Sequence, residues 1–146
     1  MRSNRVLYLL LIGCFFLVAC DQSGPIKVGF IAGLSGPGGD AGTASLNALK
    51  LAAQQINDDG GIDGRMIEII PRDDEKSPET AQNHVREFDK LGVDAIVGPI
   101  ISSIGMAMLP VINDLGIVTI SPTVSAAEFA GFRDYLFRMN TTTHQN

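Results

Sequence analysis

The chain has 146 residues, enough for one domain, and a formal net charge of −5. It contains 16 acidic and 11 basic residues, no Trp, and few aromatic residues. Surfaces that bind nucleic acid need clustered Lys and Arg, so this composition excludes a nucleic-acid partner.

Residues 1–19 have the pattern of an export signal rather than part of a folded domain. Arg2 and Arg5 form a basic start, and an almost unbroken apolar run follows from Val6 to Phe16. A basic start, a short apolar stretch and a small-residue cleavage site are typical of a secretory signal peptide. The apolar run is shorter than the roughly 20 residues that a membrane-spanning helix needs. A buried core helix and an uncleaved signal anchor are the alternatives.

The end of this segment, Leu17–Cys20, resembles the bacterial lipobox. The resemblance implies that Cys20 is acylated and becomes the first mature residue, with residues 20–25 as a lipidated tether. Asp21 resembles the signal that retains lipoproteins in the inner membrane. We therefore expect a periplasmic or otherwise extracytoplasmic domain that is anchored to the membrane by lipid on Cys20. Because Cys14 lies in the signal, the mature domain would have no disulfide and no Cys-based metal site.

Strands and helices are predicted to alternate through the rest of the chain. Short apolar runs rich in Val and Ile predict strands, and apolar residues at helical spacing predict helices. The predicted strands are 26–32, 66–71, 93–101, 117–120 and 135–139, and the predicted helices are 41–57, 78–91 and 103–115. Ser77 is the expected N-cap of the second helix, with Pro78 at its first position. This order predicts an α/β fold, with a Rossmann-like parallel sheet and helices on both faces. Three helices leave one face of five strands thinly covered.

Two of the predicted strands stop abruptly at hydroxyl-bearing residues. These residues are Ser102, Ser103, Ser121, Thr123 and Ser125. The carboxyl ends of parallel strands share one edge of the sheet, which is where such sheets bind ligands. Ser102 or Ser103 is the expected N-cap of the third helix, whose first N–H groups face the same edge. Hydroxyls and a helix N-terminus together suit a small anion such as a carboxylate. Ser and Thr also form caps and turns, so a purely structural role is the alternative.

The glycine-rich stretch 33–40 offers a different interpretation. Gly36–Ala41 formally fits the Gly-x-Gly-x-x-Gly/Ala phosphate loop, so a secreted dinucleotide-dependent enzyme is a remote alternative. Against it, Gly33–Ser35 separates the strand from this motif. The acidic residue expected about 20 positions further on would fall on Asp58 or Asp59, at a helix end.

No set of residues in the sequence indicates catalysis or metal binding. Asp73–Glu75 could be a cation site or a pair of catalytic carboxylates, but three acids after a strand more often form a solvated loop. His84 is expected on an exposed helix face. There is no Ser/His/Asp set, zinc-ligand spacing or Walker loop, so we expect no enzyme activity, no cofactor and no metal.

An ordered set of short motifs after Cys20 resembles one protein family. The motifs are Ile26–Gly29, Leu34–Pro37, Ile56–Arg65, Asp73–Asp74, Val97–Pro99, Ser102, Ile120–Thr123 and Tyr135–Arg138. In this order they resemble the start of the branched-chain amino-acid (Leu/Ile/Val) type of periplasmic binding protein, the substrate-binding receptor of an ABC importer. The resemblance implies a type I periplasmic binding fold, in which two Rossmann-like lobes enclose the ligand in a cleft. It makes residues 26–146 an incomplete N-terminal lobe, and the chain a fragment.

The resemblance also implies ligand contacts at particular positions. It assigns the Ser102 hydroxyl to the α-carboxylate of an amino acid, and Thr123 and Ser125 to the carboxylate and α-amino group. Ser35 and Ser121, which lie within matching motifs, complete the candidate ligand-binding set. The acidic partner for the ligand's ammonium would come from the second lobe.

The ligand's identity is less defined by the resemblance. Members that bind branched-chain amino acids often carry an aromatic residue in the first loop, where this chain has Ala41. The implied ligand is therefore a small amino acid or an amide-like compound, and the implied partner of the complete protein is an ABC permease. The same fold also serves as the ligand-sensing domain of receptors and regulators that transport nothing, which remains the alternative function.

Overall fold

The computed structural model describes residues 24–131 and 133–141. The predicted signal peptide, the predicted lipidation site Cys20 and Asp21 lie outside the described residues. The strands are β1 (Ile26–Ala32), β2 (Ile67–Asp73), β3 (Ala95–Val97), β4 (Thr119–Ser121) and β5 (Leu136–Arg138). The helices are α2 (Gly39–Asp58), α3 (Pro78–Leu91), α4 (Ser102–Leu115) and the short 3-10 helix η1 (Ala127–Phe129).

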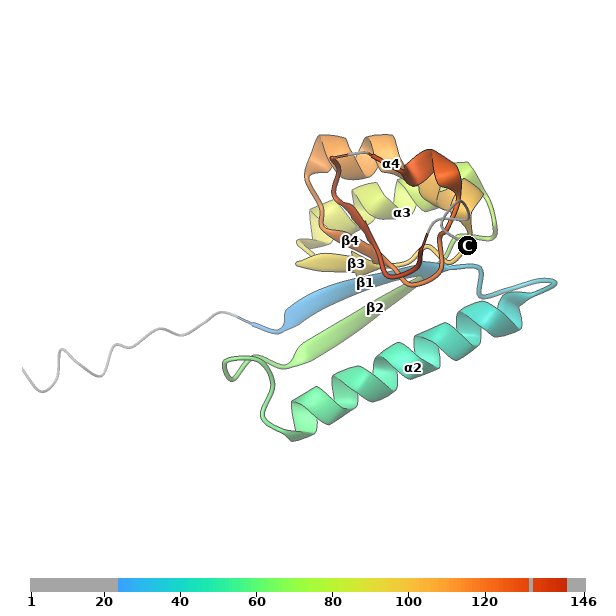
Figure 1. Cartoon of the computed structure of the whole chain (residues 1–146). Coiled ribbons are helices and arrows are strands. Elements are labelled where there is room, and N and C mark those ends of the chain that lie inside the picture. Colours follow the sequence, from blue (N-terminus) through green and yellow to red (C-terminus); the bar gives the residue numbers. More distant parts are fainter. Residues whose placement is uncertain (1–23, 132, 142–146) are drawn as a thin grey trace, which may run out of the picture.

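The five strands form one parallel sheet in the order β2-β1-β3-β4-β5. Helix α2 lies on one face of this sheet, and α3 and α4 lie together on the other (Figure 1). The predicted α/β fold, with a parallel sheet and helices on both faces, is confirmed. Within the described residues, no helix combines the length and the apolar character that crossing a membrane requires.

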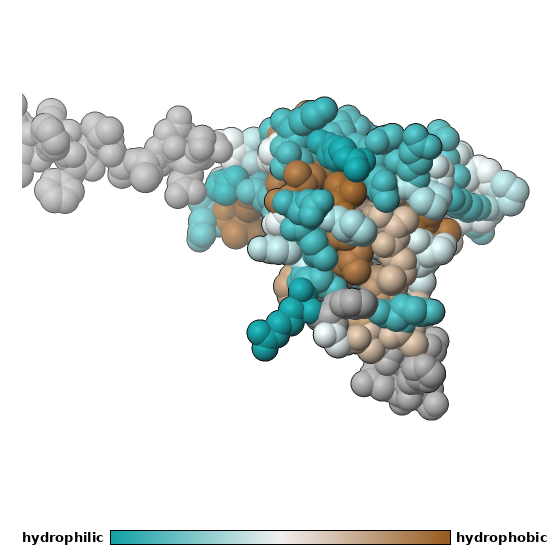
Figure 2. All heavy atoms as spheres, turned by 90° about the horizontal axis from the view of Figure 1, so that it is seen from above, coloured by the Kyte–Doolittle hydropathy of each residue, from teal (hydrophilic) through white to brown (hydrophobic). Residues whose placement is uncertain are grey.

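The larger part of the core lies between the sheet and the helices α3 and α4. Ile31 and Ile96 project from neighbouring strands onto Val85 and Phe88 of α3, and all four are fully buried. Side chains alternate between the two faces of a strand, so Phe30 projects to the opposite face and packs with Leu46 of α2. Seen from the side of α3 and α4, hydrophilic residues surround a smaller apolar area (Figure 2).

The face that carries α2 is covered over only part of its width. Phe30, Val97, Ile120 and Phe137 stand in register across four neighbouring strands, and residues in register project to the same face. Phe30 is 1% exposed beneath α2, whereas Phe137 on the edge strand β5 is 56% exposed. The prediction of one thinly covered face is confirmed, and the open part lies over β4 and β5.

The two predicted helix caps had different outcomes. Ser77 caps α3 as expected, since its hydroxyl oxygen accepts a hydrogen bond from the Thr80 N–H at 3.2 Å. The prediction that Ser102 or Ser103 caps α4 is wrong, because α4 begins at Ser102 and the capping position falls on Ile101. No side chain caps this end of α4. The Ser102 hydroxyl is turned toward the loop after β4 instead.

An ion pair joins β2 to α3. Arg72 donates two hydrogen bonds to Glu87, from Nε to Oε2 at 3.0 Å and from Nη2 to Oε1 at 2.6 Å. The Arg72 hydrogen bond is the main cause that lowers the pKa of Glu87 to about 2, against an ordinary value of 4.5. The paired carboxylate therefore stabilises the fold above pH 4.5, and this contribution is lost as the pH falls toward 2.

We expect Glu87→Gln to lower the free energy of unfolding at pH 7 by about 1 kcal/mol, the upper range for a partly exposed pair. The difference between the variant and the wild type should shrink between about pH 4.5 and pH 2, because the wild-type carboxylate becomes protonated there. Urea unfolding at a series of pH values measures both effects. A difference that stays constant down to pH 2 would show that the ion pair contributes nothing to stability.

Candidate ligand-binding edge

Three loops meet at the carboxyl edge of the sheet. They follow β1, β3 and β4, which are neighbours in the sheet, so the loops are neighbours as well. β2 lies on one side of β1 and β3 on the other, so the strand order reverses direction at β1. The crevice outside such a reversal is where open α/β sheets bind ligands.

Hydrogen bonds tie the loop after β3 to the loop after β4. The Ser125 N–H donates to the Ser102 Oγ at 3.3 Å. The Thr123 hydroxyl donates to the Ile100 carbonyl oxygen at 2.8 Å. The structure therefore brings together three of the predicted site residues, Ser102, Thr123 and Ser125, at the start of α4.

This cluster keeps donors available for an anion. The Ser102 oxygen accepts a hydrogen bond, but among the described residues its hydroxyl donates to no partner. The Ser125 hydroxyl has no partner in the same part of the chain, and both residues are half-buried. No side chain caps the first turn of α4, so the N–H groups of this turn are further donors beside the hydroxyls. They lie at the positive end of the helix dipole. Hydroxyl and backbone donors at a helix N-terminus suit a carboxylate.

Ser121 lies beneath the cluster and not on its surface. It is fully buried, and its hydroxyl donates to the Pro99 carbonyl oxygen at 2.6 Å. Its oxygen also accepts from the Val124 N–H at 3.2 Å. Both hydrogen-bonding roles of the hydroxyl are thus used within the fold, and the side chain fixes the loop after β4 against the loop after β3.

Ser35 lies on the loop after β1, here called the first loop (residues 33–38). It is exposed, and no hydrogen bond joins it to Ser102, Thr123 or Ser125 among the described residues. It faces Asp73 at the end of β2, whose Oδ1 also accepts from the Leu34 N–H at 2.8 Å. Partial burial raises the pKa of Asp73, but hydrogen bonds from the Ser35 hydroxyl and from backbone N–H groups outweigh it and lower the net pKa.

The interpretation of Asp73–Glu75 as a solvated loop is wrong for two of its three residues. Asp73 is the last residue of β2, and Asp74 is 0% exposed. The Asp74 N–H donates to the Ala32 carbonyl oxygen of β1. This hydrogen bond continues the pairing of β2 with β1 by one residue and keeps Asp74 against the sheet. Its Oδ1 accepts from the Lys76 N–H at 2.7 Å, and burial raises its pKa. An Asp that bonds the N–H two residues on is a common turn device, and this is the signal the sequence offered.

His84 was expected on an exposed face of its helix, and this is wrong. It is half-buried, with Nδ1 at 3.2 Å from Glu87 Oε2 and Nε2 at 3.1 Å from the Asp73 carbonyl oxygen. These contacts join α3 to the end of β2. Within residues 24–131 and 133–141, no group of His, Cys, Asp and Glu is arranged to hold a metal ion.

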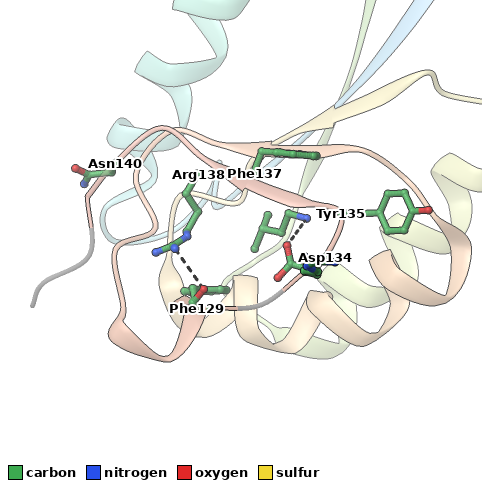
Figure 3. Close-up of a pocket in the computed structure, with 9 residues that line it drawn as sticks. Phe129, Asp134, Tyr135, Phe137, Arg138 and Asn140 are labelled. Atoms are coloured by element: carbon green, nitrogen blue, oxygen red, sulfur yellow. Dashed lines mark hydrogen bonds between the residues drawn. The ribbon is translucent and has the colours of Figure 1, made fainter. Parts of the chain in front are cut away.

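A pocket lies beside the edge strand β5, and none of the predicted site residues lines it (Figure 3). Its lining includes Phe129, Asp134, Tyr135, Phe137 and Arg138. Arg138 donates from Nη2 to the Phe129 carbonyl oxygen at 3.2 Å, and its guanidinium lies 5.7 Å from the centre of the Phe129 ring. These contacts close η1 over the end of β5, so the pocket is a product of local packing at the sheet edge.

Comparison with known sequences identifies relatives over nearly all of the described part. The family model described as periplasmic binding protein matches residues 25–146. The Leu/Ile/Val-binding protein of Escherichia coli (strain K12) is 29% identical over 135 residues, which cover 91% of this chain and 36% of that protein. The leucine-specific-binding protein of Salmonella typhimurium is 29% identical over 116 residues, which cover 80% of this chain and 31% of that protein.

Solved structures agree with these relatives. The substrate-binding protein LivJ of a branched-chain amino acid transporter from Streptococcus pneumoniae, in complex with isoleucine, superposes with a TM-score of 0.76 and 31% identity. The match covers 81% of this chain and 34% of that structure. An ABC transporter substrate-binding protein from Sphaerobacter thermophilus gives a TM-score of 0.71 and 29% identity, over 78% of this chain and 32% of the structure.

Each match covers most of this chain but only about a third of the related protein. The chain spans about a third of the length of the curated relatives it matches. Its five parallel strands and three helices correspond to the first lobe of type I periplasmic binding structures. The family consists of extracytoplasmic binding proteins and not of enzymes, so the dinucleotide-dependent enzyme is excluded. This chain belongs to the periplasmic binding protein family.

Proposed function

We propose that this chain forms the first lobe of the substrate-binding receptor of an ABC importer, and that the complete receptor captures an amino acid in a cleft between two lobes. The observation that carries the proposal is the cluster of Ser102, Thr123 and Ser125 at the uncapped start of α4. This cluster offers hydroxyl and backbone donors at the edge where such sheets bind ligands. The lobe would hold the backbone of the amino acid, whatever its side chain.

The cluster has chemistry suited to an α-carboxylate. The hydroxyl of Ser102 and the N–H groups of the first turn of α4 donate to carboxylate oxygens, and the Ser125 hydroxyl serves the carboxylate or the α-amino group. The Thr123 hydroxyl already donates to the Ile100 carbonyl oxygen, so its oxygen serves the α-amino group as an acceptor. Ser121 contributes by holding these loops in place, and Ser35 extends the site onto the first loop. The ammonium of the ligand finds its counter-charge on the second lobe.

The ligand class follows from the relatives. Their names describe binding of leucine, isoleucine and valine, and one of the solved structures contains isoleucine. Ala41, which replaces the aromatic residue expected near the first loop, lies within the first turn of α2. A small side chain there leaves more room beside the ligand, so we include small amino acids and amide-like compounds with the branched-chain amino acids.

Calorimetry tests the proposal on the complete native protein that carries this sequence. Titration with leucine, isoleucine, valine, alanine and small amides should give saturable binding by at least one of them. Absence of binding by the whole panel would contradict the amino-acid receptor. Co-purification with a permease and an ATPase would separate the transport receptor from a sensing domain of the same fold, which has neither partner.

We further propose that lipid on Cys20 anchors the protein to the membrane. The support is the lipobox-like segment Leu17–Cys20, with Asp21 favouring the inner membrane. The intact mass of the native protein, released from the membrane of its own cells, checks this. Acylated Cys20 adds the mass of the lipid to the mature chain, whereas an uncleaved anchor keeps residues 1–19.

The 146-residue chain by itself should bind amino acids at least a hundredfold more weakly than the complete protein does. The physical reason is that a lone lobe keeps its half of the contacts exposed to water, and closing two lobes removes the competing solvent. Calorimetry on both proteins with the same amino acid measures the ratio. Equal affinity would place the whole site on this lobe and would refute the two-lobed cleft.

A further inference from the structure

Two consecutive residues after β2, Glu75 and Lys76, have a left-handed backbone conformation. Their φ angles of +52° and +56° lie in a region that residues other than glycine enter rarely and at a cost in free energy. Asp73 Oδ1 accepts from the Glu75 N–H at 2.9 Å, which holds the first of them. Asp74 Oδ1 accepts from the Lys76 N–H at 2.7 Å, which holds the second. These two carboxylates thus fix the turn between β2 and α3, and with it the direction in which the Lys76 side chain leaves the main chain.

The Lys76 side chain lies across the first loop, from its start to its end. Its Cγ and Cε atoms lie 3.3 Å from the position that a Cβ on Gly33 would occupy. Its Nζ lies 3.5 Å from the corresponding position on Gly38. Gly33 is buried, although Lys76 as a whole is exposed. Long cationic side chains commonly pack their aliphatic stem while the charged end stays in water, and Lys76 covers the start of the loop in this way.

Helix α2 and the end of β2 hold the same part of the first loop. A Cβ on Gly42, near the start of α2, would overlap the Gly33 carbonyl oxygen, so the helix and the loop are in close contact there. The Leu34 N–H donates to Asp73 Oδ1 at 2.8 Å. The start of the loop is therefore enclosed between α2, the end of β2 and the stem of Lys76.

We propose that Lys76 is a positioning residue for the ligand site, and that its aliphatic stem holds the first loop in place at the binding edge. This inference rests on the proposed function, in which Ser35 extends the site onto the first loop. Gly33 and Leu34 come directly before Ser35, so a loop enclosed between Lys76 and α2 presents that serine at one place beside the sheet. Without the stem, the loop samples other positions, and only a fraction of the molecules is ready to bind.

Calorimetry on the complete native protein, with leucine as the probe amino acid, is the first test. Lys76→Gly should bind leucine roughly threefold to tenfold more weakly, because the apparent affinity falls with the fraction of molecules whose loop is in place. Lys76→Met keeps a stem atom at each position out to Cε and removes the charge, so it should bind as the wild type does. Glu75→Gly is the matched control, since it relaxes the neighbouring left-handed residue and touches no part of the first loop. It should also bind as the wild type does.

Hydrogen exchange of the Leu34 amide, measured without ligand, reports the position of the loop directly. This N–H donates to Asp73 only while the start of the loop is in place. Its protection should fall in Lys76→Gly, and should be retained in Lys76→Met and in Glu75→Gly. Asp73→Ala removes the acceptor, and its exchange rate gives the limit for an amide without this hydrogen bond.

The outcomes separate this inference from the proposed function. Absence of leucine binding by the wild type, with the expected exchange pattern, supports the positioning role and counts against a leucine receptor. A Lys76→Gly variant with wild-type affinity, or with wild-type protection of Leu34, overturns the role of Lys76. Weaker binding by Lys76→Met with full protection of Leu34 also overturns it, because the ammonium would then act on the ligand and not on the loop.

Discussion

Replacing both Ser102 and Ser125 by Ala in the complete protein should weaken amino-acid binding by well over tenfold. A hydrogen bond to a charged group contributes roughly 1.5–3 kcal/mol, and the double variant removes two hydroxyls that donate to the carboxylate or accept from the α-amino group. It also removes the Ser102 oxygen that accepts from the Ser125 N–H, so the loop after β4 loses one of the hydrogen bonds that tie it to the loop after β3. Calorimetry with the preferred amino acid of the wild type measures the loss.

The control for this double variant is Ser45→Ala on α2. The Ser45 hydroxyl donates to the Ala41 carbonyl oxygen within its own helix, so its removal changes no contact at the candidate site. Its affinity should equal that of the wild type. If the double variant also binds with wild-type affinity while remaining folded, then Ser102 and Ser125 are turn formers, and the carboxylate site lies elsewhere.

The second large effect is expected at Gly98, directly after β3. Its φ of +116° is a conformation that favours glycine, and a Cβ at this position would overlap the Ile31 carbonyl oxygen of β1. The Gly98 N–H donates to the Ile120 carbonyl oxygen at 2.9 Å, so the residue cannot move away without breaking the link to β4. We expect Gly98→Ala to lower the free energy of unfolding by about 2–4 kcal/mol, as backbone strain and overlap add.

Urea unfolding compares this variant with Gly64→Ala. Gly64 also has a positive φ, of +80°, but no atom lies within 4 Å of the position of its Cβ. Gly64→Ala therefore carries the backbone strain without the overlap, and should cost about 1 kcal/mol. A Gly98→Ala variant no less stable than Gly64→Ala would show that β1 and β3 can separate freely at this point, so that the loop before Ser102 is not fixed by close packing.

The alternation of strands and helices was readable from the sequence because each element carries a local signal. The first strand and the helix from Pro78 to Leu91 were predicted at their observed bounds. The first relies on an apolar run ended by glycine, and the second on a Ser cap followed by Pro. The strands at Ala95–Val97 and Thr119–Ser121 are shorter than predicted. Their apolar runs continue into the neighbouring loops, including the buried Gly98 and Pro99 after β3, and hydropathy alone does not separate such loops from strands.

The errors about individual side chains all concern where a polar group finds its partner. Ser102 was expected to cap its own helix, but its hydroxyl meets Ser125, 23 residues further along the chain. Asp74 was expected in water and is buried, and His84 was expected on a free surface and contacts the end of β2. Short polar residues can bond locally or across the fold with similar energies, so tertiary contacts decide between them.

The sequence by itself determined the α/β class, the order of the elements and the edge of the sheet at which hydroxyl residues gather. These follow from periodicity, glycine and proline positions and strand polarity, all of which are local properties of the chain. The tertiary structure alone decided that Ser102, Thr123 and Ser125 form one cluster, that Ser121 lies beneath it, and that Asp73 joins the first loop to α3. Contacts between residues distant in the chain depend on strand register and helix packing, which no local pattern specifies.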